Sequence, residues 1–130
     1  MANGTDNGNF RLAARITGLN VLVASGFAIA GLVIPHSILP PGSAVTEAAE
    51  IFALYAAART LPLAAIVLIA IYKRSVQALI VLGILAGVIQ WMDAGVGFFQ
   101  KDAGKIIGPL ILGALQFYAV SRLKRSAINR

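Results

Sequence analysis

Residues 47–72 read EAAEIFALYAAARTLPLAAIVLIAIY, an apolar run that opens with two carboxylates, Glu47 and Glu50, and carries Arg59 within it. About 20 apolar residues are enough to cross the hydrocarbon core of a bilayer, so this run is long enough to span one. A charged side chain is costly in hydrocarbon and needs a partner or a function there. The stretch therefore predicts a membrane-spanning helix, kinked near Pro62, that carries a polar site around Arg59.

One apolar run precedes this helix in the sequence and two follow it. The connections between consecutive runs are short, and they are polar or rich in proline. Helices joined by short connections are antiparallel neighbours. The predicted fold is all-α, an integral membrane four-helix up-down bundle over 11–125. Residues 1–10 are expected to be a flexible segment and residues 126–130 a basic tail. The four helices are predicted over 11–34, 45–72, 75–99 and 105–123.

The composition agrees with a membrane protein, since 58% of the residues are hydrophobic and only 12% are charged. Soluble domains carry about 25% charged residues. The chain has no cysteine and a single histidine, His36. Disulfides, thiolate metal sites and cysteine nucleophiles are therefore excluded, and no metal and no cofactor is expected.

The chain has a net charge of +6, and the positions of its lysines and arginines indicate how it is oriented in a membrane. The cations lie at the ends of the apolar runs, so the expected partner is the lipid bilayer and not nucleic acid. Only Lys101 and Lys105 fall on one side of the predicted membrane. The positive-inside rule then places both termini in the cytoplasm. Eight cations share that side: Arg11, Arg15, Lys73, Arg74, Arg122, Lys124, Arg125 and Arg130.

The depth of Arg59 can be compared with that of polar residues in the next helix. At 1.5 Å per residue, Arg59 lies roughly 20 Å from the cytoplasmic end, Gln90 roughly 22 Å and Asp93 roughly 27 Å. Asp93 is therefore the first choice for the partner of Arg59, with Gln90 and Tyr55 as hydrogen-bonding support. Glu50 lies about 180° around the helix from Arg59 and is not expected to pair with it.

Two interpretations of this cluster stay open. The Arg59–Asp93 pair can be an interhelical ion pair that sets the register of two helices. Alternatively, the cluster lines a pocket in the outer half of the bundle that binds a small lipophilic molecule or acts on it by acid–base chemistry, with Glu50 and Asp93 as candidate catalytic residues. Whether the protein is an enzyme is left open. The candidate ligand-binding residues are Glu47, Glu50, Tyr55, Arg59, Gln90, Trp91 and Asp93.

Some of these residues also have plain structural interpretations. Glu47 and Glu50 can be first-turn carboxylates that face water, and Trp91 can belong to an interfacial aromatic belt. Asn20 and Gln116 lie at similar depths and are predicted to hydrogen-bond between the first and last helices as part of the packing. The Gly83/Gly87 spacing allows close helix approach, either within the bundle or between copies in a homo-oligomer.

Three segments together resemble a known family. They are ARTLPLA at 58–64, QWMDAGVG at 90–97 and GPLILGAL at 108–115. The pattern is similar to that of small four-span bacterial membrane proteins of the DoxX-like superfamily. In that group an arginine in the second helix and an acid late in the third recur, which correspond here to Arg59 and Asp93. The resemblance implies a four-helix bundle in the bacterial inner membrane, and it implies no catalytic role.

Two other functions compete with a small-molecule site. One is a small proton-coupled multidrug-type transporter, which fits the size of the chain and its membrane glutamates. The distribution of cations, eight to two, argues against a transporter that inserts in both orientations. The other is a structural or accessory subunit of a larger membrane complex, in which the polar residues contact a partner and no pocket exists.

Overall fold

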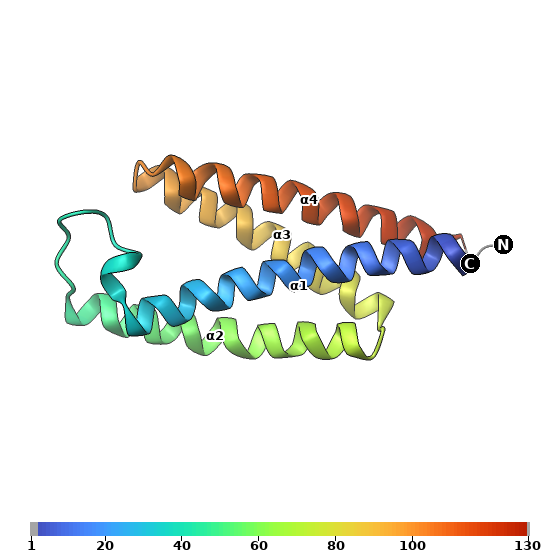
Figure 1. Cartoon of the computed structure of the whole chain (residues 1–130), viewed down its shortest axis with the longest axis horizontal. Coiled ribbons are helices and arrows are strands. Elements are labelled where there is room, and N and C mark those ends of the chain that lie inside the picture. Colours follow the sequence, from blue (N-terminus) through green and yellow to red (C-terminus); the bar gives the residue numbers. More distant parts are fainter. Residues whose placement is uncertain (1–2, 130) are drawn as a thin grey trace. The chain divides into compact units, whose positions relative to one another are not determined.

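The computed structural model describes residues 3–129, and the side chains of residues 7–129. The chain forms four long helices and no strand within residues 3–129, and the predicted all-α four-helix bundle is confirmed. Each long helix is apolar enough to cross a membrane, so the chain is a multi-pass membrane protein. The elements are α1 (Asn3–Val33), a 3-10 turn η1 (Pro35–Ser37), α2 (Glu47–Tyr72), α3 (Val76–Phe99) and α4 (Ala103–Ile128) (Figure 1).

The first and last helices of the chain, α1 and α4, are longer than predicted. α1 begins at Asn3, so the expected flexible segment is helical from that residue, and residues 1–2 lie outside the described range. The added turns are held by burial, because Phe10 is only 8% exposed in the core. Arg74 Nη2 also donates a hydrogen bond of 2.9 Å to Asn7 Oδ1. α4 likewise continues to Ile128, through most of the expected basic tail.

The chain divides into two units. The first comprises Met1–Asn20 and Val67–Arg130, and the second comprises Val21–Ile66. The first unit includes a part of every long helix, and it contains the main apolar core. In the second unit α1 approaches α2 at Gly31, where an added Cβ would lie 3.7 Å from Ala53 Cβ. The core residues of the first unit are Phe10, Ala13, Leu79, Ile80, Ala119, Val120 and Leu123.

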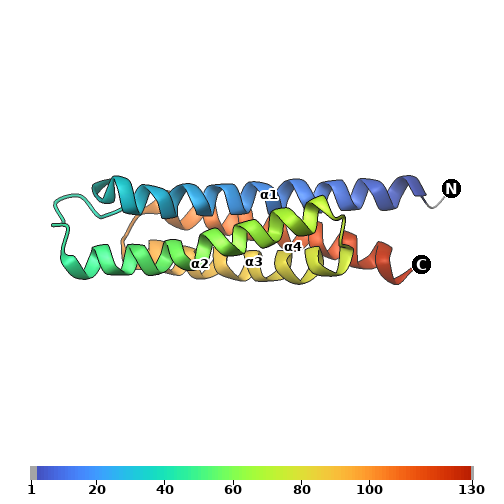
Figure 2. The ribbon, with the colours of Figure 1, turned by 90° about the horizontal axis from the view of Figure 1, so that it is seen from below.

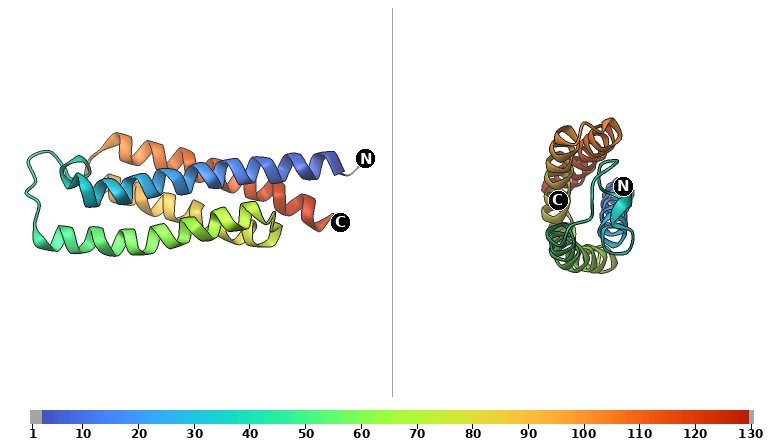
Figure 3. Two further views of the ribbon diagram at one scale, coloured as in Figure 1. Left: turned by 60° about the horizontal axis from the view of Figure 1, so that its bottom comes forward. Right: turned by 90° about the vertical axis from the view of Figure 1, so that its left-hand side faces the viewer.

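The contact between α3 and α4 depends on small residues. An added Cβ on Gly83 would lie 2.5 Å from Val120 Cγ2, and one on Gly87 would lie 2.8 Å from the ring of Phe117. These glycines let the two helices approach closely, and α3 and α4 lie side by side in Figure 3. The Gly83/Gly87 spacing therefore serves packing within the chain. A homo-oligomer through Gly83/Gly87 would have to displace α4, because both residues are buried against it.

The turns at the two ends of α3 are built in the same way. Arg74 and Lys101 both adopt a left-handed conformation, with φ of 52° and 54°. Around each, the next residue donates its N–H back across the turn: Ser75 N to Ala70 O at 2.9 Å, and Asp102 N to Gly97 O at 3.1 Å. This is the hydrogen bond of a Schellman motif, which satisfies carbonyls at a helix end.

Replacing Lys101 with glycine is expected to stabilise the protein. Glycine reaches a positive φ without the steric cost that an L side chain meets there, and the gain is about 0.5–1 kcal/mol. Lys124 is an exposed lysine inside α4, so Lys124→Gly is the control and should cost about 0.5–1 kcal/mol. Reversible unfolding in mixed detergent micelles measures both. A loss of stability in Lys101→Gly would contradict this account of the turn.

Most cations of the first unit are collected at one end. The start of α1, the turn at 73–75 and the end of α4 lie together there (Figure 2). The seven described cations at this end are all exposed: Arg11, Arg15, Lys73, Arg74, Arg122, Lys124 and Arg125. This clustering matches the charge asymmetry predicted from the sequence.

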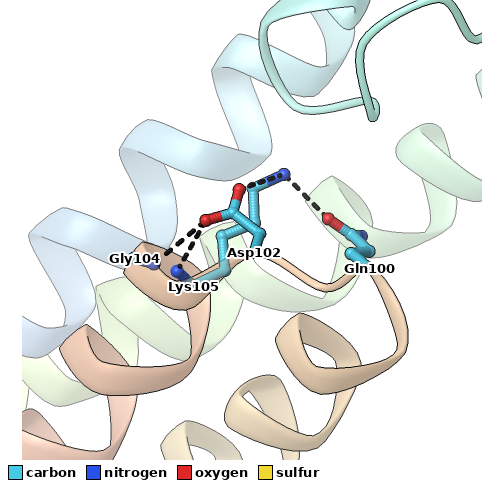
Figure 4. A network of polar contacts seen from close by, with 4 residues as sticks. All are labelled: Gln100, Asp102, Gly104 and Lys105. Atoms are coloured by element: carbon cyan, nitrogen blue, oxygen red, sulfur yellow. Dashed lines mark hydrogen bonds and ion pairs between the residues drawn. The ribbon is translucent and has the colours of Figure 1, made fainter.

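At the opposite end of the first unit, one of the two lysines is neutralised. Asp102 caps α4 by accepting hydrogen bonds from Gly104 N at 3.0 Å and Lys105 N at 3.2 Å. Lys105 Nζ lies 3.6 Å from Asp102 Oδ2 and donates to Gln100 Oε1 at 2.8 Å (Figure 4). Lys101 is exposed and carries the remaining positive charge of this turn. The paired Lys105 therefore contributes less net positive charge to this end than an isolated lysine would.

Candidate functional site

The first turn of α2 holds the two glutamates. Thr46 caps the helix, since its Oγ1 accepts a hydrogen bond of 3.2 Å from Ala49 N. Glu47 and Glu50 follow and are both exposed. Carboxylates at this position are stabilised by the positive end of the helix dipole. Their geometry is that of first-turn acids, one of the two interpretations that the sequence left open.

Arg59 lies at the middle of α2, twelve residues after Glu47 and thirteen before Tyr72. Its guanidinium carbon lies 5.7 Å from the centre of the Tyr55 ring, one turn earlier on the same helix. Ala57, the buried residue nearest in sequence, is about 160° away around the axis. Both Tyr55 and Arg59 are exposed, so they lie on the outward face of α2 and not on its buried face.

The ring of Tyr55 does not offset the cost of this charge. A cation over an aromatic ring gains about 0.5–1 kcal/mol at exposed sites. An arginine at the centre of a membrane-spanning helix costs about 2.5–3.5 kcal/mol even on the most permissive scale. Within Val21–Ile66 no carboxylate forms an ion pair with Arg59, although the unit contains Glu47 and Glu50. Within Val21–Ile66 the charge of Arg59 is therefore not offset by a carboxylate.

Trp91 and Asp93 lie on opposite flanks of α3, about 160° apart around its axis. Trp91 packs on α4: an added Cβ on Gly113 would lie 2.5 Å from Trp91 Cδ1, and the Phe117 ring lies 5.0 Å away, edge to face. Asp93 is exposed, six residues before Phe99 and so roughly 9 Å inside the end of the helix. Within residues 7–20 and 67–129 no cation pairs with Asp93. These two candidates do not share a surface.

A buried network of polar side chains joins α1, α3 and α4. Gln90 Nε2 donates to Asn20 Oδ1. Asn20 Nδ2 donates to Gln116 Oε1 at 3.2 Å, and Gln116 Nε2 donates to Thr17 Oγ1 at 2.7 Å. All four side chains are at most 5% exposed. The predicted hydrogen bond between Asn20 and Gln116 is therefore confirmed, and Gln90 belongs to this network.

Sequence reasoning missed Thr17 and the central position of Gln116. Because α4 continues to Ile128, Gln116 lies near the middle of this helix. Gly83 leaves room for the network, because an added Cβ there would lie 2.8 Å from Gln116 Nε2. The sequence did carry a signal for the role of Thr17, because Thr17 lies one turn before Asn20 and therefore on the same face of the helix.

Of the seven predicted ligand-binding residues, the structure brings Tyr55 and Arg59 together. Four of the seven belong to the second unit and three to the first. The predicted Arg59–Asp93 pair would join the two units and stays a prediction. Six of the seven are exposed; the buried exception is Gln90. Among the described residues, no group of three or more histidine, aspartate or glutamate side chains is placed to hold a metal ion.

No family model matches the chain, and neither a curated protein nor a solved structure matches it. The functional interpretation therefore rests on the exposed Tyr55–Arg59 pair and on the closed polar network.

Proposed function

We propose that the protein binds a small lipophilic molecule with an acidic group, and that Arg59 and Tyr55 form its recognition point. The observation that carries this proposal is an exposed guanidinium at the middle of a membrane-spanning helix, with a tyrosine ring as its neighbour. A carboxylate or phosphate of the ligand supplies the counter-charge in charge-assisted hydrogen bonds. The lipophilic part of the ligand stays in hydrocarbon.

The surroundings of Arg59 on α2 support such a ligand. Phe52, Tyr55, Arg59, Pro62 and Ile66 recur at alternating spacings of three and four, so they form one stripe along the helix. All five are exposed, and Phe52 reaches 72% exposure. An apolar stripe with one cation at its centre fits an amphiphile that enters sideways from the bilayer. Glu47 and Glu50 lie near the outer end of this helix.

Two predictions from the sequence belong to the same proposal. Asp93 is proposed as the resting counter-ion of Arg59, which the acidic group of the ligand replaces. Glu50 and Asp93 remain the proposed acids if the bound molecule is also chemically changed. We propose further that the chain is a distant member of the DoxX-like superfamily, supported by an arginine in the second helix and an acid late in the third.

The proposed location is the bacterial inner membrane with both termini in the cytoplasm. Its support is the group of seven exposed cations at one end of the first unit. At the other end, Lys105 is paired with Asp102, which leaves Lys101 as the exposed cation of that turn. Such a bias sets the orientation of membrane proteins with short loops.

Arg59→Ala is expected to lower the affinity for a long-chain fatty acid about 10- to 100-fold, as for the loss of a hydrogen bond to a charged group. The chain offers a matched control in Arg122, whose guanidinium carbon lies 5.9 Å from the ring of Tyr118 one turn earlier. Arg122→Ala, near the basic end of α4, should leave the affinity unchanged. Fluorescence titration of the purified protein with a labelled fatty acid, and with the matching alcohol, measures both.

Two outcomes would count against this function. Equal affinity for the acid and the alcohol would show that no cation recognises the headgroup. Unchanged binding in Arg59→Ala would remove Arg59 from the site. Arg59→Lys keeps the charge but loses the planar fork, so it should retain part of the affinity. Circular dichroism checks that each variant is folded.

An accessory-subunit function is the second candidate, because the polar groups of the core are already satisfied. No buried side-chain nitrogen or oxygen within the described residues lacks a hydrogen-bond partner. The exposed stripe on α2 would then dock against an acidic partner helix. A photoreactive residue in place of Phe52 separates the two candidates: crosslinks to a protein of defined mass support the subunit, and crosslinks to lipophilic molecules support the binding protein.

A further inference from the structure

We infer that the turn at 73–75, together with Asn7, Phe10 and Arg11 of α1, forms a binding site for the phosphate headgroup of an anionic phospholipid, centred on Arg74. All of its residues belong to the first unit, and none belongs to the Tyr55–Arg59 stripe. The inference is therefore independent of the proposed function of α2.

The side chain of Arg74 is held in place from several directions. Its backbone occupies the left-handed position of the Schellman turn, with Arg74 N donating to Ile71 O at 3.0 Å. Its Nη2 donates to Asn7 Oδ1 at 2.9 Å, and its guanidinium carbon lies 5.4 Å from the centre of the Phe10 ring. Phe10 is itself buried in the core, so the ring is a fixed support.

This arrangement leaves most of the guanidinium available. Arginine carries five N–H donors in a rigid fork, and the hydrogen bond to Asn7 uses one of them. A fork that is already oriented loses little conformational freedom when it binds, and it matches the geometry of a phosphate. Arg74 is exposed, so a headgroup can reach it.

The surroundings of Arg74 match a lipid in charge and in depth. Lys73 lies in the same turn, and Arg11 lies one helical turn after Asn7 on α1; both are exposed. No ion pair involves the cations at this end among residues 7–129. Tyr72, next to the turn, is 87% exposed, as expected of an aromatic ring at the level of the headgroups. A phospholipid presents both the phosphate and the apolar chains that this position requires.

The opposite turn of α3 provides a matched comparison. Lys101 occupies the same left-handed position as Arg74, with φ within a few degrees. Its neighbour Lys105 is already paired with Asp102. Arg74→Gly and Lys101→Gly therefore each remove one cation and relieve the same backbone strain, but only the first removes the proposed site.

The test measures phospholipid retention by native mass spectrometry of the full chain, with phosphatidylglycerol and phosphatidylcholine of identical acyl chains. The wild-type protein is expected to retain phosphatidylglycerol selectively. Arg74→Gly should reduce that retention about fivefold, the effect expected when one cation near the membrane contributes ~1 kcal/mol. Lys101→Gly should leave it unchanged. Asn7→Leu, which keeps every charge but removes the orienting oxygen, should reduce it about twofold.

Three results would overturn the inference. Equal losses in Arg74→Gly and Lys101→Gly would show no site at this turn. An equal loss in Arg125→Gly would show that the cations act as a diffuse patch. Full competition by soluble glycerol phosphate would identify a phosphate site that does not require a lipid. If Arg74→Gly fails to fold, Arg74→Lys replaces it, with an expected partial loss because lysine lacks the planar fork.

Discussion

Gly97→Ala is expected to destabilise the protein by about 3 kcal/mol, the upper part of the range for overpacking. An added Cβ at this position would lie 2.4 Å from the carbonyl oxygen of Lys105 and 2.9 Å from Ile106 N. These are backbone atoms in the first turn of α4, so no side-chain rotation relieves the clash. The helices would have to separate, and the cap that Asp102 provides to α4 would be disturbed with them.

Gly95 provides the control for this substitution. It lies on the same helix, but an added Cβ would have no neighbour within 4 Å. Gly95→Ala should therefore stabilise the protein by about 0.5–1 kcal/mol, the difference in helix propensity. Both variants can be measured by unfolding the detergent-solubilised protein with increasing sodium dodecyl sulfate. Similar stabilities for the two variants would show that α3 and α4 are not in the close contact described here.

Gln116→Leu is expected to destabilise the protein by about 2 kcal/mol, since it leaves buried polar groups without partners. Gln116 is 0% exposed. Its amide accepts a hydrogen bond from Asn20 and donates one to Thr17. Leucine is close to glutamine in size, so the loss reports the hydrogen bonds more than a change in packing. The same unfolding titration measures it, with Gln77→Leu, an exposed glutamine of α3, as the control.

A double-substitution cycle separates the network from simple packing. If Asn20 and Gln116 act as partners, the variant with leucine at both positions should lose less stability than the sum of the two single variants. Hydrogen bonds within membrane proteins average about 0.6 kcal/mol in such cycles, so the expected coupling is of that order or larger. Strictly additive losses would contradict the hydrogen bond between these side chains.

Hydropathy and turn residues predicted most of the helical architecture. The bounds of α2 and α3 agree with the expected ones within two residues, because the Lys73–Ser75 turn and the polar residues after Phe99 are strong breaks. The start of α1 was missed, since residues 3–9 have a polar composition that carries no hydropathy signal. Their helical state accompanies tertiary contacts of Phe10 and Asn7 that no local pattern reveals.

The candidate site was predictable where it depends on a single helix. The Tyr55–Arg59 contact follows from their spacing of four residues. Depth along parallel axes also paired Asn20 with Gln116 correctly. Depth says nothing about the direction in which a side chain points, and for this reason Gln90 was assigned to Arg59 instead of Asn20. Trp91 and Asp93 were both candidate ligand-binding residues, although they lie on opposite flanks of α3.

The four side chains of the buried network come from α1, α3 and α4, and none comes from α2. The exposed stripe with Arg59 at its centre lies entirely on α2. Selection can therefore act on the outward face of α2 without disturbing the hydrogen bonds of the core. A scan of all single substitutions should find the stripe tolerant in expression and folding, and Gly83, Gly87 and Gly97 of α3 intolerant. Under the proposed function, new ligand preferences would arise on α2 while the buried network stays nearly invariant.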